Sequence, residues 1–223
     1  MVPPTSPSAC ERCSIPPSGG KRVRDFRFLW AQAVTRFDPA DRARTQNIRL
    51  AGQRLDGRVL PPGTTLSFNQ IVGSRQSADS AFKPAPVFSD KGRVRALGGG
   101  VCQVSSTLYA AVLLTDLQVL ERHAHAMPVP YLAPGLDATV SNALDLKIRN
   151  PHPFAVQIRM RVEEPRLHVE VWAEQPFRQK VTLSRRASRC FRDGVPAVQV
   201  AVWRVYGSGP REKMSEDVYY LGR

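Results

Sequence analysis

Apolar residues recur at helical spacing in one early stretch of the chain. Between residues 38 and 56, Ile48, Ala51 and Leu55 fall on one face, and arginines occupy the opposite face. This pattern predicts an amphipathic helix on the surface of the core. Asp38 is the expected N-cap, because a side-chain oxygen there can accept a hydrogen bond from a free backbone N–H.

Most of the remaining chain has the alternating pattern of β-strands. Apolar and polar residues alternate between residues 154 and 173, where Glu164 and Pro165 predict a turn between antiparallel strands. Residues 86–89 and 93–97 flank a turn sequence and predict a hairpin. Further strands are predicted over residues 65–72, 118–125, 129–132, 143–149, 181–186 and 197–206.

One apolar run is too continuous for a surface element. It extends from Val101 to about Leu114 and follows glycines at positions 98–100. Its length and residue types predict a buried helix, and the glycines permit a tight turn before it. We therefore expect an α+β fold, in which a mostly antiparallel sheet packs on a buried central helix that carries Cys102 at its N-terminus.

Length and composition limit the number of domains. The 223 residues are 42% hydrophobic, which is enough for one sizeable core. We expect a disordered tail over residues 1–20, one domain over residues 21–177, and a β-rich C-terminal extension over residues 178–223.

Four cysteines do not have the spacing of a disulfide framework. Cys10 and Cys13 form a single Cys-x-x-Cys in a Pro/Ser-rich segment; half a metal site or a redox pair is the alternative to an unstructured tail, which we favour. Cys190 follows a basic strand and shows no chemistry around it. Cys102 is therefore the cysteine with candidate chemistry.

Cys102 stands where the glycine turn becomes the predicted helix. The first N–H groups of a helix lack intrahelical partners and the helix dipole is positive there, so a thiolate would be stabilised and its pKa lowered. The N–H groups of residues 101–103 could also receive an oxyanion. The alternative is a cysteine that only packs beneath the helix. The candidate site around Cys102 comprises Gly100, Val101, Gln103, Ser105, Ser106 and Tyr109.

Two histidines follow about twenty positions later. His123 and His125 would point to the same face of a strand. A cysteine, an imidazole and a group that orients the imidazole are the parts of a nucleophilic acyl-transfer site, and Asp137 is the best-placed third member, with Asp145 behind it. Both histidines and Cys102 could instead bind zinc, but no clear fourth ligand is present, so we expect no metal and no cofactor.

In these motifs the chain closely resembles the VanW family. The resemblance covers about residues 44–175, and it is carried by residues 60–69, 72–73, 98–109 and 135–140 together with Glu121, Arg122, His125 and Tyr131. It implies a role in the bacterial cell envelope and L,D-transpeptidation, the cysteine-dependent formation of 3-3 cross-links between peptidoglycan stem peptides. It also implies Cys102 as the nucleophile and His125 as its base.

The chain departs from the family pattern in two places. Ala126 stands where the family usually has serine, and residues 74–82 keep little of the usual sequence. These departures leave the nucleophile in place and the substrate preference open. The implied enzyme is a cysteine L,D-transpeptidase or a peptidase, and a non-catalytic basic module that docks on peptidoglycan or an envelope partner is the second hypothesis.

The net charge is +13, from 32 basic and 19 acidic residues. Such a surface attracts nucleic acid, anionic lipid or an anionic wall polymer. The arginines are scattered and no RNA-binding aromatic signature accompanies them, so we expect a solvated basic face, no nucleic-acid partner and a monomer. Peripheral association with a membrane or an anionic wall polymer stays open. Arg122 is expected to hold a substrate carboxylate or to pair with Glu121 or Asp137.

The sequence contains no apolar stretch of the length of a membrane span, and residues 1–20 lack the apolar core of a secretory signal. The resemblance nevertheless implies an extracytoplasmic location. We therefore expect an export signal that precedes this sequence.

Overall fold

The computed structural model describes residues 25–75, 80–89 and 92–221. The tail predicted over residues 1–20, with its two cysteines, lies outside the described residues. The elements in chain order are β1 (Phe28–Arg36), α1 (Arg42–Leu55), β2 (Arg58–Leu60), β3 (Thr65–Ser67), α2 (Phe68–Val72), β4 (Pro84–Ser89), β5 (Gly92–Leu97), α3 (Val101–Leu113), β6 (Gln118–Glu121), β7 (Lys147–Arg149), β8 (Val156–Glu163), β9 (Arg166–Ala173), β10 (Val181–Arg192), β11 (Val195–Tyr206) and β12 (Arg211–Tyr220).

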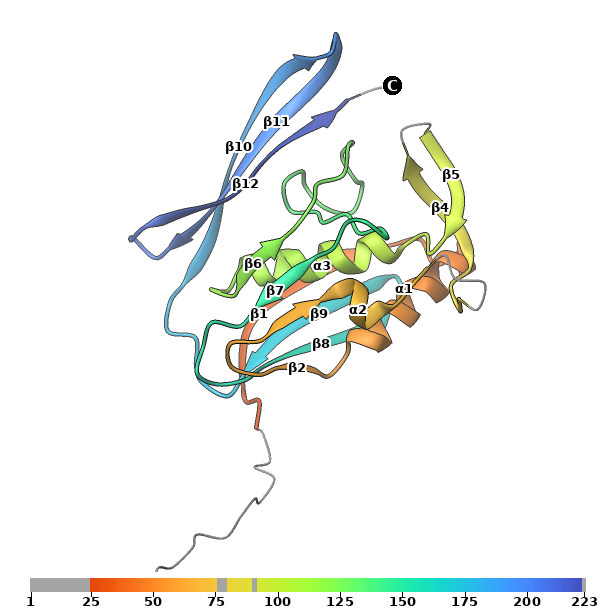
Figure 1. The fold of residues 1–223 in the computed structure, drawn as a ribbon. Coiled ribbons are helices and arrows are strands. Elements are labelled where there is room, and N and C mark those ends of the chain that lie inside the picture. Colours follow the sequence, from red (N-terminus) through yellow and green to blue (C-terminus); the bar gives the residue numbers. More distant parts are fainter. Residues whose placement is uncertain (1–24, 76–79, 90–91, 222–223) are drawn as a thin grey trace, which may run out of the picture.

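The largest sheet is antiparallel and has the strand order β1-β9-β8-β2. Alternate residues of β8 and β9 are buried, and Ile158 lies opposite Val171, so one face of the sheet is apolar. Helix α3 packs on β1 and β9, and α1 packs on β8, which covers this sheet with both helices (Figure 1). The predicted α+β class and the mostly antiparallel sheets are confirmed.

Helix α3 runs through the core. Every residue of α3 except Cys102 is buried, because the helix is apolar around most of its circumference. Gly100 is the N-cap with a φ of +103°, and the N–H of Val101 already donates to the carbonyl of Gly98. The helix therefore starts at Val101. Cys102 lies inside α3 as its second residue, not at the helix N-terminus as predicted.

Gly99 lets the turn before α3 approach the β4–β5 hairpin. A Cβ at this position would lie 2.5 Å from the carbonyl oxygen of Ala85. Asn47 of α1 joins the same region, because its side-chain amide donates to the carbonyls of Lys83 at 2.8 Å and Gly99 at 2.9 Å. The hairpin and α1 thus support the first turn of α3 from outside.

Two three-stranded antiparallel sheets complete the fold, in addition to the two-stranded β4–β5 hairpin. One has the order β3-β7-β6 and the other has the order β10-β11-β12. Figure 1 shows the β10–β12 sheet above α3, with the loop of residues 122–146 between this sheet and the β4–β5 hairpin. The sheet comes from the region predicted as a β-rich extension, and the domain boundary at residue 178 stays a prediction.

Helix α1 begins later than predicted. The side chain of Asp41 accepts from the N–H of Arg44 at 3.1 Å and is the N-cap. Asp38 accepts from the N–H of Ala40 at 2.9 Å, so it closes a turn ahead of the helix. An aspartate side chain caps the helix as predicted, but the capping residue is Asp41 and not Asp38.

Several predicted strands are also corrected. The strand predicted over residues 65–72 ends at Ser67, whose Oγ accepts from the N–H of Gln70 and starts α2. Strands β1, β2 and β12 were not among the predicted elements. Other predicted strands are shorter than expected or missing: residues 118–125 reduce to β6, residues 143–149 reduce to β7, and residues 129–132 form none.

Arg204 of β11 connects the C-terminal sheet to the end of α3. Its side chain is 1% exposed, and its guanidinium donates to the carbonyl oxygens of Leu113 at 3.1 Å, Leu117 at 3.2 Å and Val112 at 3.3 Å. The last carbonyls of a helix lack intrahelical partners and carry the negative end of the dipole. A buried cation at this point therefore stabilises α3.

We expect Arg204→Met to lower the free energy of unfolding by about 3 kcal/mol, because each buried carbonyl that loses its donor costs about 1–3 kcal/mol. Urea denaturation followed by circular dichroism measures the change. Arg211→Met is the control, since Arg211 is exposed on β12 and its loss should cost less than about 1 kcal/mol. Similar losses in the two variants would contradict this role of Arg204.

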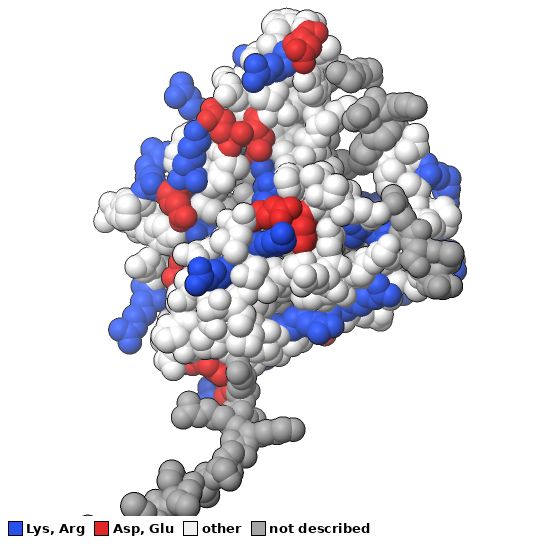
Figure 2. Space-filling model, in the orientation of Figure 1, with Lys and Arg blue, Asp and Glu red and all other residues white. Residues whose placement is uncertain are grey.

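Charged side chains are spread over the surface. Figure 2 shows Lys and Arg intermingled with Asp and Glu on the face in view, without a single large basic patch. Surface ion pairs contribute to this pattern, for example Lys147 with Glu121 at 2.7 Å. No helix within the described ranges is long and apolar enough to cross a membrane.

Candidate active site

Cys102 contacts the loop of residues 122–146. Its Sγ lies 3.4 Å from the carbonyl oxygen of Val140, and a side-chain hydrogen bond links it to His125. Burial alone would raise the pKa of the thiol. The hydrogen bond and the charge of His125 outweigh burial, so the pKa of Cys102 is lower than its ordinary value. This environment favours the thiolate.

His125 is held by Asp137. Its Nδ1 lies 2.6 Å from Oδ2 of Asp137, and its backbone N–H donates to the same oxygen at 2.8 Å. Because Nδ1 is occupied, Nε2 is the ring nitrogen that can bond to Cys102. Burial would lower the pKa of His125, but the hydrogen bonds to Asp137 and Cys102 raise it to about 9. The lowered pKa of Cys102 and the raised pKa of His125 both favour a thiolate–imidazolium pair.

Asp137 is fully buried and accepts hydrogen bonds on both oxygens. Besides its bonds to His125, its Oδ1 accepts from the hydroxyl of Tyr219 at 2.6 Å and from Nη2 of Arg122 at 3.2 Å. Burial would raise the pKa of this carboxyl, but the hydrogen bonds from His125 and Tyr219 lower it to about 2. Cys102, His125 and Asp137 therefore form one continuous set of hydrogen bonds.

Strand β12 supplies the support behind Asp137. Tyr219 also accepts from the N–H of Gly135 at 2.7 Å, and Asp217 pairs with Nη1 of Arg122 at 2.5 Å. A Cβ at Gly135 would lie 2.5 Å from the side chain of Val202, so the loop runs directly against this sheet. Neither Tyr219 nor Asp217 was a predicted site residue, because nothing in their local sequence marks a contact with Asp137 or Arg122.

Arg122 forms the predicted ion pair with Asp137. Its side chain is 6% exposed, and its donors go to Asp137, Asp217 and Tyr219. The guanidinium also lies over the ring of Tyr109, 5.1 Å from the ring centroid. These contacts leave Arg122 behind the site, where it holds Asp137 rather than facing a substrate. Tyr109 is fully buried beneath it.

Ser105 and Ser106 form hydrogen bonds between α3 and the loop of residues 122–146. Their hydroxyls donate to the carbonyl of Ala138 at 2.7 and 3.3 Å and to the carbonyl of Cys102 at 3.1 and 2.6 Å. The N–H of Ala138 in turn donates to Ser106 at 3.0 Å. Because Ala138 follows Asp137 directly, these two serines fix the position of the carboxylate relative to the helix.

The backbone N–H groups at the start of α3 are mostly occupied. Val101 donates to the carbonyl of Gly98 and Gln103 donates to that of Gly100, both at 3.0 Å. Two of the three groups expected to receive an oxyanion are therefore taken by the glycine turn. The N–H of Cys102 makes no hydrogen bond to any other residue that the structure describes.

The side chain of Gln103 is occupied as well. It donates to Thr35 and to the carbonyl of Arg36, both at 2.9 Å, and it accepts from Arg44 at 2.7 Å. This buried amide joins α3, β1 and α1. These contacts give the side chain of Gln103 a structural role and leave it no free amide for an oxyanion.

His123 and Asp145 lie outside the hydrogen-bonded set. Nε2 of His123 lies 3.1 Å from Glu121, and its side chain is 38% exposed. Because β6 ends at Glu121, the two histidines do not share a strand face. Asp145 accepts from Ser67 at 2.5 Å instead of orienting His125. Within the described part of the chain, no three His, Cys, Asp or Glu side chains are arranged to hold a metal ion.

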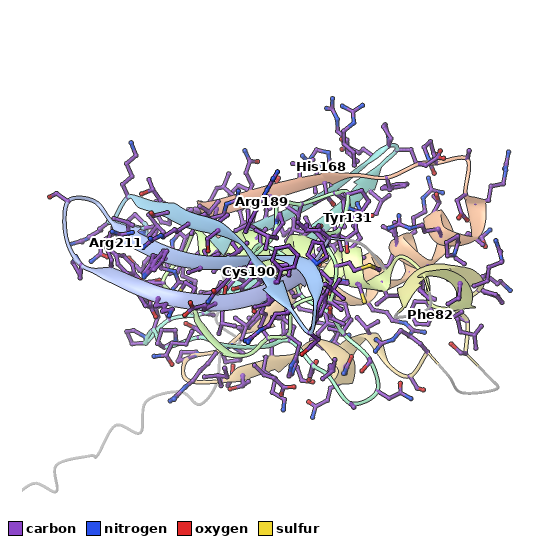
Figure 3. The ribbon with its side chains drawn as sticks, turned by 90° about the horizontal axis from the view of Figure 1, so that it is seen from above. Phe82, Tyr131, His168, Arg189, Cys190 and Arg211 are labelled. Carbon is purple, nitrogen blue, oxygen red and sulfur yellow. The ribbon has the colours of Figure 1, made fainter. Side chains whose placement is uncertain are left out.

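The charge of Cys102 also acts on Arg75 and Tyr131, although neither was a predicted site residue. Both interact electrostatically with the thiolate, and Tyr131 is hydrogen-bonded to Ser106. Burial raises the pKa of Tyr131, which keeps its hydroxyl neutral. Figure 3 shows Tyr131 between the β10–β12 sheet and the β4–β5 hairpin. A cavity of about 320 Å³ opens next to it and is also lined by Arg36, Asp38, Asp41, Arg44 and Gln103.

A known protein family matches the part of the chain that contains this site. The family described as VanW like protein matches residues 43–172, which is more than half of the chain. The chain belongs to the VanW-like family. The matched segment of this VanW-like chain contains Cys102, His125 and Asp137, but it ends before Tyr219 and Asp217.

Two curated relatives are similar to the chain over part of its length. The chain is 40% identical over 131 residues to the uncharacterized protein YoaR of Bacillus subtilis (strain 168), covering 58% of this chain and 43% of YoaR. It is 30% identical over 135 residues to the vancomycin B-type resistance protein VanW of Enterococcus faecalis (strain ATCC 700802 / V583), covering 58% and 49%. The chain thus spans about half the length of these curated relatives. No solved structure matches it.

The pH dependence of thiol labelling tests whether Cys102 and His125 interact in this VanW-like chain. Because the pKa of Cys102 is lowered, its labelling by iodoacetamide should reach a plateau at lower pH than expected for an ordinary thiol of pKa 9.0. Peptide mass spectrometry gives the rate for each cysteine. In urea the contact with His125 is lost, and the curve should move to higher pH. An identical curve for folded and unfolded protein would contradict a lowered pKa.

Proposed function

We propose that this chain is a cysteine-dependent acyltransferase of the bacterial cell envelope that acts on peptidoglycan stem peptides. Transfer to an amine forms 3-3 cross-links, and transfer to water makes the same site a peptidase. The observation that carries the proposal is the hydrogen-bonded set of Cys102, His125 and Asp137. The resistance named for VanW of Enterococcus faecalis supports a cell-wall substrate.

The first half-reaction acylates the enzyme. The thiolate of Cys102 attacks a peptide carbonyl carbon, the C–S bond forms, and the carbonyl electron pair moves to oxygen. His125 gives its Nε2 proton to the leaving amine as the C–N bond breaks, which leaves a thioester on Cys102. Asp137 keeps the ring oriented and stabilises its positive charge throughout.

The second half-reaction releases the acyl group. An acceptor amine gives a proton to His125 and attacks the thioester, the C–S bond breaks, and the thiolate is restored. Water in place of the amine yields a shortened peptide. The cavity beside Tyr131 carries both arginine and aspartate side chains, which suits a peptide that bears carboxylate and amine groups.

A binding module without catalysis is the second candidate. Such a module needs neither a low thiol pKa nor a buried carboxylate behind a histidine. Burying Asp137 with Arg122 and His125 carries a desolvation cost that packing alone would avoid. Perturbed groups of this kind gather at functional sites. This burial favours the enzyme over the module.

Incubation with purified muropeptides tests the proposal. Liquid chromatography with mass spectrometry should reveal cross-linked or shortened peptides and a peptide adduct on Cys102. Cys102→Ala should abolish both signals, and the matched control Cys190→Ala, which changes a cysteine of β10, should keep them. Sedimentation with cell-wall sacculi and binding to DNA are measured on the same proteins.

Each outcome separates the candidates. Equal product from Cys102→Ala and the unmodified protein would overturn the cysteine mechanism. Sedimentation with sacculi by both proteins, with product from neither, would establish the binding module. Retention on DNA with a steep salt dependence, and none on sacculi, would favour a nucleic-acid binder.

A further inference from the structure

Arg75 is a buried cation that packs against the glycine turn leading into the nucleophile. It is 7% exposed, and its Nη2 donates to Oδ1 of Asn69 at 3.2 Å. Asn69 is itself fixed, because its amide donates to the carbonyls of Ser141 at 2.8 Å and Leu144 at 2.9 Å. The position of Arg75 is therefore set by the loop that also carries Val140, the partner of the Cys102 thiol.

The glycine turn fits closely around this side chain. A Cβ at Gly98 would lie 2.8 Å from Cδ of Arg75, so only glycine leaves room for the arginine at this distance. Gly98 precedes Cys102 by four residues and accepts the first hydrogen bond of the turn before α3. The aliphatic part of Arg75 thus packs on the backbone that leads into the nucleophile.

One end of the guanidinium has no hydrogen-bond partner among the described residues. Nη1 of Arg75 is buried and makes no hydrogen bond to the residues that the structure describes. A buried donor without a partner costs about 1–3 kcal/mol, so an unpaired guanidinium nitrogen in a packed site calls for an acceptor supplied from outside. Burial lowers the pKa of Arg75, and the charges of Cys102 and Asp145 partly restore it.

Most of the N–H donors that were expected to hold an oxyanion already have other hydrogen-bond partners. Acyl transfer to sulfur creates an oxyanion next to Cys102, and such sites hold it with two or more preorganised donors. The N–H groups of Val101 and Gln103 are already used, as is the amide of Gln103. Only the N–H of Cys102 stays available among the groups at the start of the helix that were expected to serve.

We propose that Nη1 of Arg75 and the backbone N–H of Cys102 together hold the oxyanion of the tetrahedral intermediate. This inference rests on the proposed acyl transfer and names a catalytic residue for it. When the thiolate attacks, the C–S bond forms and the carbonyl electron pair moves to oxygen, where the guanidinium stabilises it. When the leaving group departs, the pair returns to re-form the carbonyl.

Two reagents separate this role from an effect on the thiol. Acylation of Cys102 by p-nitrophenyl acetate passes through an oxyanion and releases p-nitrophenolate. Alkylation by iodoacetamide displaces iodide at a saturated carbon and forms no oxyanion. A change in the thiolate fraction alters both rates equally, whereas loss of an oxyanion donor alters only acylation. Neither reagent carries a carboxylate, so anchoring of a substrate carboxylate would leave both rates unchanged.

We expect Arg75→Met to slow acylation of Cys102 about 10²- to 10³-fold, the usual effect of losing one oxyanion donor, and to slow alkylation less than about tenfold. Rates in Cys102→Ala are subtracted to isolate this cysteine. Arg75→Lys keeps a charge and should lie between Arg75→Met and the unmodified protein. Arg95→Met, at an exposed position of β5, is the control and should react normally.

The outcomes distinguish the inference from the proposed function. An unmodified protein with no Cys102-dependent acylation would refute acyl transfer itself. Acylation that proceeds normally in Arg75→Met, or that falls by the same factor as alkylation, would refute the role of Arg75 alone. If circular dichroism shows that Arg75→Met is unfolded, Arg75→Lys is used instead. A slower acylation of Cys102 without a matching fall in its alkylation would support the role of Arg75, and equal changes in both rates would refute it.

Discussion

Replacement of His125 by glutamine is expected to lower the rate of acyl transfer by about 10² to 10⁴, the usual contribution of a positioned general acid and base. Two effects combine. The leaving amine loses its proton donor, and the thiol loses the hydrogen bond and charge that lower its pKa. Product formation from muropeptides, measured by liquid chromatography and mass spectrometry, gives the rate.

His123→Gln is the matched control for this variant. His123 lies two residues earlier, but its ring contacts Glu121 rather than Cys102. We expect its replacement to change the rate by less than about threefold, in the range of surface substitutions. A comparable loss in both variants, or a larger loss in His123→Gln, would show that the wrong imidazole has been assigned as the base.

The same variants also test the pH range of activity. The thiolate–imidazolium pair requires a pH above the lowered pKa of Cys102 and below the pKa of His125, which is about 9. The rate should therefore fall as pH rises through about 9 in the unmodified protein. This alkaline limb should be absent from the residual rate of His125→Gln.

Replacement of Asp137 by alanine should have the largest effect on stability. It removes the partner of Arg122, His125 and Tyr219 at once and leaves a buried guanidinium without one of its two carboxylates. Removing one member of a buried ion pair costs about 3–5 kcal/mol, and we expect a decrease of that size in the free energy of unfolding. Urea denaturation measures it.

Tyr219→Phe provides a graded comparison. It removes one hydrogen bond from the same carboxylate and leaves the charges in place, so it should cost about 1.5–3 kcal/mol. The carboxyl has a pKa of about 2 in the folded chain. Because this pKa is below that of an unfolded aspartate, about 3.9, the stabilisation is present above that pH and is lost as pH falls toward 2. An Asp137→Ala variant no less stable than Tyr219→Phe would contradict the assigned network.

Elements with a strong local signal were predictable from sequence. The apolar run of α3 and the alternation in β8 and β9 report burial directly, because a buried helix and a half-buried strand require those patterns. Strand β12 has no such signal. Its sequence is polar at most positions and only Tyr219 is fully buried, so the strand exists because β11 pairs with it.

The chemistry of the site was only partly predictable. Cys102, His125 and Asp137 could be selected because few side chains perform acyl transfer, and the structure brings them together. The pairing of His123 with His125 depended on a strand that ends earlier, at Glu121. Arg75 and Tyr219 are ordinary residues in their local sequence. Their places are decided by tertiary contacts, which periodicity does not encode.

Strand β12 also affects when the site can assemble during synthesis. Tyr219 is 82 residues beyond Asp137, and Asp217 is 95 residues beyond Arg122. A nascent chain that has already produced the cysteine and both histidines still lacks the groups that hold the carboxylate. Asp137 and Arg122 therefore gain their last hydrogen-bond partners only when β12 has been made and has paired with β11.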